Sequence, residues 1–169
     1  MTRAPALVIL EADGWIARQL ADLATENAWL IRPARTVDAA LSLVRERRPC
    51  VLFVQAELAE DAPDPLRLIA DLSRELPDVP IVAVSDVKLN DADRVQWAAA
   101  LFDLGARVAL FPPLTQPVLE DAASGLMAAA IRRTVGDAPA SAKQSAPKPK
   151  ARRKPAEPVI DLADEDMHE

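Results

Sequence analysis

Three short runs of consecutive apolar residues place the strongest constraint on the fold of this chain. They lie at residues 6–10, 51–54 and 81–84, and each is rich in valine, leucine or isoleucine. Runs of this length and composition are typical of strands that are buried on both faces. Such strands occur in parallel sheets that are covered by helices on both sides, so the sequence favours an α/β fold.

Segments with helical periodicity separate these runs. Ile16, Leu20 and Leu23, for example, recur at the spacing of one helix face. Thr36 is a predicted N-cap, and either Asp91 or Asp93 is predicted to cap a later helix. We expect helices at residues 15–27, 37–48, 66–76, 91–104 and 116–133, and two weaker strands at residues 29–32 and 107–111.

The predicted strands and helices alternate along the chain. Alternation at this spacing indicates βαβ units with right-handed crossovers. Residues 1–133 are therefore predicted to form one flavodoxin-like, doubly wound domain with a five-stranded parallel sheet in the order 2-1-3-4-5. In sheets of this kind, functional groups gather at the carboxyl ends of the strands, which makes Gln55, at the end of the 51–54 run, a residue of interest.

The composition changes after Arg133. Residues 138–158 consist mainly of Ala, Pro, Lys, Ser and Arg, and such a segment is predicted to be disordered. We treat residues 134–169 as a disordered linker with a basic block at 148–154 and an acidic end. Within the acidic end, Val159, Ile160 and Leu162 form an apolar island that is a candidate docking motif; the alternative is a tail that only improves solubility.

Composition excludes several classes of function. The single cysteine and single histidine exclude an internal disulfide and argue against a zinc site. A formal net charge of −6 argues against general nucleic-acid binding. No apolar run is long enough to span a bilayer and the amino terminus lacks a signal-peptide pattern, so a cytoplasmic protein without cofactor or membrane insertion is expected.

Several stretches, in this order, resemble the response-regulator receiver domain of bacteria. The resemblance covers about residues 7–133. It depends on the acidic turn Glu11-Ala12-Asp13-Gly14 after the first strand, on Arg48-Pro49 before the central run, on Pro80 to Ser85, and on Gly105-Ala106 followed by Pro113-Leu114.

The resemblance implies a set of phosphoryl-transfer residues that this chain has largely lost. In the family, two acids after the first strand and an aspartate after the third hold magnesium, and that aspartate accepts the phosphoryl group. A Ser or Thr and a Lys contact the phosphoryl oxygens. At the matching positions the chain has Glu11, Ala12, Gln55, Ser85 and Pro112, and Ala109 replaces the usual aromatic residue.

The losses agree with one another, because the covalent acceptor and its positive counter-charge are absent together. We interpret the chain as a degenerate pseudo-receiver: a non-enzymatic signalling or adaptor protein with no catalytic residue and no metal site. Glu11 and Asp13 could bind a divalent ion, but two carboxylates are few for such an ion. Ser85 could equally satisfy local backbone groups.

Two surfaces are candidates for binding a protein partner or a second copy of the chain. The first is the face of the helix at 91–104, the strand at 107–111 and the last helix, which receiver domains commonly use for output. If Val95, Ala98, Ala99 and Phe102 face the core, Trp97 points partly outward and can anchor a partner. The predicted contact residues there are Trp97, Val108, Leu110 and Leu114; the second surface is the tail motif.

Two alternative functions remain open at this point. In one, an arginine cluster at Arg45, Arg47 and Arg48, or the basic block of the tail, binds a cyclic dinucleotide or another small ligand through its phosphates. In the other, the chain is an atypical phosphoacceptor that uses Glu57 or Asp61. Cys50 is expected to be a packed thiol at the start of a strand.

Overall fold

The computed structural model describes residues 3–57 and 65–136, and within them it contains a five-stranded parallel sheet in the order β2-β1-β3-β4-β5. The predicted fold class and strand order are therefore confirmed. The strands are β1 (Ala6–Leu10), β2 (Leu30–Ala34), β3 (Cys50–Gln55), β4 (Ile81–Val84) and β5 (Val108–Leu110).

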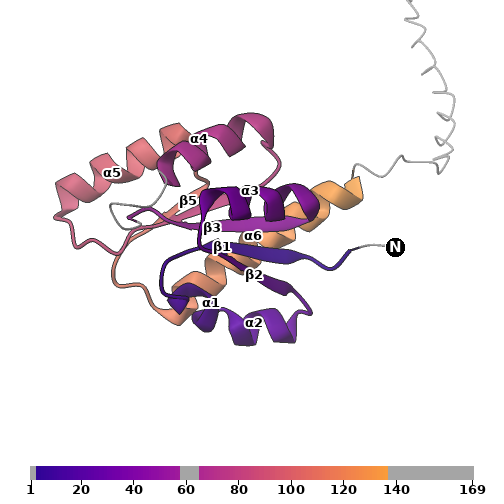
Figure 1. The fold of residues 1–169 in the computed structure, drawn as a ribbon. Helices are drawn as coiled ribbons and strands as arrows, with labels where there is room; N and C mark the ends of the chain where they lie inside the picture. The colour runs from indigo at the N-terminus through magenta and orange to yellow at the C-terminus, as the bar shows by residue number, and fades with distance from the viewer. Residues whose placement is uncertain (1–2, 58–64, 137–169) are drawn as a thin grey trace, which may run out of the picture. The chain divides into compact units, whose positions relative to one another are not determined.

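Helices cover both faces of the sheet (Figure 1). One face packs against α3, α4 and α5, and the other packs against α1, α2 and α6. The helices are α1 (Trp15–Gln19), α2 (Ala21–Glu26), α3 (Val37–Glu46), α4 (Pro65–Glu75), α5 (Asp91–Leu104) and α6 (Gln116–Gly136). No helix in the described ranges is long and apolar enough to cross a membrane.

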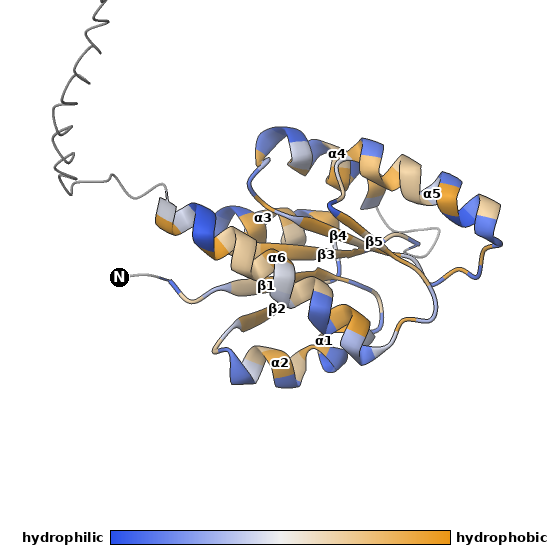
Figure 2. Ribbon diagram, turned by 180° about the vertical axis from the view of Figure 1, so that it is seen from behind, coloured by the Kyte–Doolittle hydropathy of each residue, from blue (hydrophilic) through white to orange (hydrophobic). Residues whose placement is uncertain are grey.

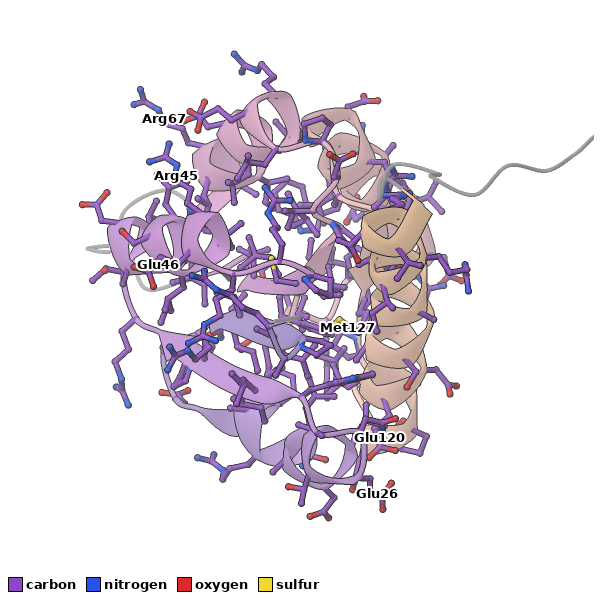
Figure 3. The ribbon with its side chains drawn as sticks, turned by 90° about the vertical axis from the view of Figure 1, so that its right-hand side faces the viewer. Glu26, Arg45, Glu46, Arg67, Glu120 and Met127 are labelled. Carbon is purple, nitrogen blue, oxygen red and sulfur yellow. The ribbon has the colours of Figure 1, made fainter. Side chains whose placement is uncertain are left out.

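The central strands send alternate side chains into two separate cores. In β3, Leu52 and Val54 pack under α3, α4 and α5, whereas Val51 and Phe53 pack on the side of α6. All four side chains have 0% of their surface exposed, which explains why the run lacks the polar alternation of a half-exposed strand. Met127 of α6 points towards the sheet and closes the second core (Figure 3).

The first helical segment differs from the prediction, because it is divided into α1 and α2 at Leu20. Leu20 is fully buried and has φ −97° and ψ 0°, a local distortion within the right-handed helical region that hydropathy does not encode. The edge strand β2 includes Pro33, which an edge position tolerates because one side of the strand has no ladder to donate to.

The N-cap of α5 also differs from the prediction. Asn90, and neither Asp91 nor Asp93, caps this helix: its side chain accepts a hydrogen bond of 2.9 Å from the backbone N–H of Asp93. Asn90 has the extended backbone that an N-cap requires. The two aspartates lie in the first turn, where negative charge is favourable near the positive end of the helix dipole.

The last helix continues beyond its predicted end. α6 includes Thr134 to Gly136, so the predicted disorder from Thr134 onward is wrong for these residues. Residues 137–169 lie outside the described ranges. The predictions about the basic block and about Val159, Ile160 and Leu162 therefore remain predictions.

Candidate functional site

Three polar side chains are buried at the carboxyl edge of the sheet. Glu11 follows β1, Gln55 ends β3 and Ser85 follows β4, and their exposed fractions are 2%, 4% and 0%. The parallel order of β1, β3 and β4 brings these ends to one edge, which is where an open α/β sheet places its functional groups. Each buried polar group needs hydrogen-bond partners, and these partners define what the site can do.

Glu11 uses both carboxylate oxygens to cap α1. Its Oε2 accepts a hydrogen bond of 2.7 Å from the backbone N–H of Ile16, and its Oε1 accepts one of 3.0 Å from that of Ala17. These N–H groups belong to the first turn of the helix and have no intrahelical partner. Glu11 therefore has a structural role, while the neighbouring Asp13 is exposed to solvent.

Gln55 links two loops across the sheet edge. Its Oε1 accepts a hydrogen bond of 3.0 Å from the backbone N–H of Ala12, and its Nε2 donates one of 3.3 Å to Oδ2 of Asp86. An amide can accept from one neighbour and donate to the other in this way, whereas an ionised carboxylate has no donor. Gln55 thus suits an acidic neighbour that an aspartate at this position would repel.

Ser85 and Trp97 both donate hydrogen bonds to the side chain of Glu57. The distances to Oε1 are 2.6 Å from the Ser85 hydroxyl and 3.2 Å from the Trp97 indole N–H, and the backbone N–H of Asp86 lies 3.3 Å from Oε2. One carboxylate therefore joins the ends of β3 and β4 to α5. Hydrogen bonds to an ionised acceptor are the stronger ones in proteins, so this cluster positions Ser85.

Sequence reasoning considered Glu57 only as an alternative phosphoacceptor. Its connecting role was missed, although an acid just beyond one strand and a serine ending the neighbouring strand were visible signals. Asp61, the other acid considered, lies outside the described residues. Among the described residues, no group of three or more His, Cys, Asp or Glu side chains is placed to hold a metal ion.

Pro112 is partly buried and lines a recess of about 410 Å³ between the β4–α5 loop and the segment after β5. Lys88 and Arg94 are the cationic side chains among the described residues of this recess. Pro112 itself offers neither a charge nor a backbone donor. The position that the receiver resemblance matches to a lysine is therefore occupied by an uncharged side chain.

The predicted partner residues do not form one continuous group. Trp97 packs against the core beneath α3, α4 and α5, whereas Val108, Leu110 and Leu114 pack against the core on the other side of the sheet. All four side chains are partly buried.

The predicted orientation of α5 is wrong. Val95 is 68% exposed and Phe102 is 50% exposed, whereas the side chain of Leu101 is fully buried and Trp97 lies inward, bonded to Glu57. Sequence periodicity could not decide the orientation, because the apolar residues of α5 form no single stripe. Figure 2 shows hydrophobic and hydrophilic turns alternating along this helix.

The arginines named as a ligand cluster have different surroundings. Arg45, on the outside of α3 (Figure 3), forms an ion pair of 2.6 Å with Glu75 of α4. Arg48 lines a separate pocket of about 320 Å³ with Arg133, and Arg47 is partly buried. The thiol of Cys50 is buried as expected, and burial raises its pKa to about 11, with a smaller opposing effect from Arg48.

Comparisons with known proteins agree with this architecture. No family model matches the sequence. The chain is 30% identical over 79 residues to the nitrogen assimilation regulatory protein NtrX of Azorhizobium caulinodans, a match that covers 47% of this chain and 17% of that protein. The match thus spans about a sixth of the relative's length.

Solved structures extend the likeness to most of the described chain. The receiver domain of NtrX from Brucella abortus has a TM-score of 0.59 at 24% identity, with 73% of this chain and 98% of that chain covered. A CheY-like receiver domain protein from Methanospirillum hungatei has a TM-score of 0.61 at 11% identity, with 78% and 99% covered. Together with the sheet order, these likenesses establish that the chain has the fold of a response-regulator receiver domain.

Proposed function

We propose that this chain is a receiver-fold adaptor of a bacterial two-component signalling or localisation pathway, and that it binds protein partners in the cytoplasm without being phosphorylated and without catalysing a reaction. The relative NtrX is named as a regulatory protein, and this supports the assignment of the chain to a signalling pathway. The observation that carries the proposal is that each buried polar group at the sheet edge already has hydrogen-bond partners within the chain.

Each group that could take part in phosphoryl transfer already has a structural partner. Glu11 caps α1, Gln55 bridges Ala12 and Asp86, and Ser85 donates to Glu57. Phosphoryl transfer needs an acceptor, a metal held by several acids and a positive group for the oxygens. An amide side chain cannot take the phosphoryl group and Pro112 cannot neutralise it, so this arrangement supports a phosphorylation-independent module.

The protein should gain no mass when it is incubated with acetyl phosphate and Mg²⁺. Intact-mass spectrometry at neutral pH measures this directly, with a receiver domain that has the full acceptor and lysine set as positive control. Gln55→Asp alone should also gain no phosphoryl group, because Pro112 supplies no ammonium and Ala12 no carboxylate. Stoichiometric addition of one phosphoryl group to the unmodified chain would contradict the proposal and would favour an acceptor such as Glu57 or Asp61.

The outer face of α5 is the best-supported surface for a partner. Val95, Ala99 and Phe102 are all exposed and recur at the spacing of one helix face. Large exposed apolar residues that share a face mark interaction sites more often than isolated ones do. We therefore assign the main partner contact to these residues, and assign Trp97 a supporting role beneath them.

Phe102→Ala should weaken partner association by more than about 1 kcal/mol, while it changes the free energy of unfolding by less than about 0.5 kcal/mol because the ring is half exposed. Quantitative recovery of partners from the native organism, and sedimentation of the purified chain for self-association, measure the effect. Ala128→Ser, on the exposed side of α6, is the matched control. If Phe102→Ala and the control recover equal amounts of partner, the outer face of α5 is not the contact surface.

A further inference from the structure

A groove with apolar walls and acidic side chains lies between the β4–α5 loop and the first turns of α5. Its volume is about 440 Å³. The Trp97 indole forms part of its wall, and no lysine or arginine among the described residues lines it. The residues that matter for its chemistry are Val87, Leu89, Trp97 and Ala100 on the apolar side, and Glu57 and Asp93 on the acidic side.

The two carboxylates of the groove are bonded only to neutral donors in the described part of the chain. Glu57 accepts from the Ser85 hydroxyl, the Trp97 indole and the backbone of Asp86. Asp93 accepts a hydrogen bond of 2.7 Å from the side-chain amide of Asn90. None of the ion pairs between described residues includes Glu57 or Asp93, so within residues 3–57 and 65–136 the carboxylates of the groove have no cationic partner.

We infer that this groove receives a lysine or arginine side chain, flanked by apolar residues, that a protein partner presents. The inference rests on the proposed function as a protein-binding module and names the chemistry of one contact. A lysine or arginine places its methylene stem on apolar surface and its charged head near acceptors. The walls fit the stem and the flanking residues, the indole face attracts a cation, and the two carboxylates complement the charge.

An anionic occupant does not suit the groove, because Glu57 and Asp93 would repel it. A purely apolar occupant would fill the walls but leave both carboxylates partly desolvated without a counter-charge, which is unfavourable. Charge complementarity therefore selects a basic segment over both.

The Trp97 indole N–H is a direct reporter for the groove, because it is bonded to Glu57 and lines the wall. The chain has three tryptophans, so the full-length protein labelled with ¹⁵N gives a small set of indole signals, and Trp97→Phe assigns the relevant one. The probes are three acetylated tripeptide amides: Leu-Lys-Leu, Leu-norleucine-Leu and Leu-Glu-Leu. They differ only in the central side chain, which is cationic, neutral or anionic.

The lysine peptide should shift the Trp97 signal to saturation and leave those of Trp15 and Trp29 unchanged. The norleucine peptide should bind about three- to tenfold more weakly, as expected for the loss of contacts to two partly exposed carboxylates, and the glutamate peptide should not bind. Higher salt should weaken the binding of the lysine peptide but not that of the norleucine peptide. Asp93→Asn should reduce its affinity by about threefold, whereas Asp121→Asn on the exposed side of α6 should not.

Equal affinity for the lysine and norleucine peptides, no shift of Trp97, or an Asp93→Asn variant that binds as well as the unmodified chain would overturn the inference. These outcomes are independent of the phosphodonor experiment and of Phe102→Ala. The peptide titration can fail while the chain stays unphosphorylated and partner binding still depends on Phe102. That combination would leave the proposed function intact and would exclude only the basic-segment contact.

Discussion

Replacing Gly105 by alanine should destabilise the protein by about 3 kcal/mol or more. Gly105 ends α5 with φ 115° and ψ 9°, a conformation that is strained for any residue with a Cβ atom. An added Cβ would also lie 2.2 Å from Cβ and 2.5 Å from Oγ of Ser73. Both effects act in the folded state, so urea unfolding followed by circular dichroism should show a clear loss of free energy of unfolding.

Ser73 cannot readily move away from the added atom. It lies in α4, and its hydroxyl oxygen is 3.0 Å from the carbonyl oxygens of both Ala70 and Leu104, which share its single O–H donor. The clash involves Cβ of Ser73, which is fixed by the helix backbone, so a change of rotamer does not relieve it. Relief requires α4 and α5 to separate, and that separation exposes apolar surface of the core beneath them.

Gly125→Ala is the matched control for the glycine substitution. Gly125 is exposed in α6, and a Cβ added there meets nothing within 4 Å. Since alanine has a higher helix propensity than glycine, this variant should gain about 0.5–1 kcal/mol of stability. Similar stabilities for the two variants would show that α4 and α5 do not approach each other as closely at Gly105 as the structure indicates.

Glu11→Ala should cost about 3 kcal/mol of stability. The substitution removes both acceptors for the N–H groups of Ile16 and Ala17, which lie 2.7 and 3.0 Å from the carboxylate. Hydrogen bonds to a charged group contribute more than neutral ones, and a buried donor left without an acceptor adds its desolvation cost. Thermal or urea unfolding measures the loss, together with reduced protection of the α1 amides from hydrogen exchange.

Two further variants separate this helix-capping role from metal binding. Glu11→Gln keeps one acceptor oxygen and should lose less stability than Glu11→Ala, whereas Asp13→Asn, at an exposed position, should change stability by less than about 0.5 kcal/mol. Addition of Mg²⁺ should leave the unfolding midpoint of the unmodified chain unchanged. A metal-dependent rise that disappears in both Glu11→Ala and Asp13→Asn would instead show that these acids hold a cation.

Much of the fold could be predicted from the chain itself because its local signals are strong and agree. The runs at residues 6–10, 51–54 and 81–84, which form most of β1, β3 and β4, are apolar at every position, and that pattern is typical of strands covered on both faces. Gly105 likewise ends its helix as a glycine with positive φ should. These features depend on neighbouring residues, so sequence is sufficient to find them.

The hydropathy of a strand also indicates whether it lies at the edge or in the centre of the sheet. The pairing of Val8, in the middle of β1, illustrates this. Val8 pairs with Arg32 of β2 on one side and with Leu52 of β3 on the other. Leu52 is fully buried, whereas Arg32 is only partly buried. The change from arginine to leucine across one strand reflects the change from the edge to the centre of the sheet, and the hydropathy of the segments already indicates it.

The candidate site was only partly predictable. The positions of Glu11, Gln55 and Ser85 at one sheet edge follow from the strand order, but their partners do not. Glu57 is bonded to Ser85, 28 positions away in the chain, and to Trp97, 40 positions away. No local pattern encodes contacts between residues so far apart. The orientation of α5 was not predictable for the same reason: its apolar residues form no single stripe, so only its packing on the sheet decided that Trp97 lies inward and its outer face is exposed.

The sequence by itself thus determined the α/β class and predicted the strand order, because the alternation of strands and helices depends on short-range periodicity. The loss of the acceptor and lysine stays a prediction that the receiver resemblance implies. Only the tertiary structure decided that Glu11 caps a helix, that Gln55 bridges two loops and that Glu57 holds Ser85. The physical reason is that a buried polar group takes its role from the donors and acceptors around it, and those come from distant parts of the chain.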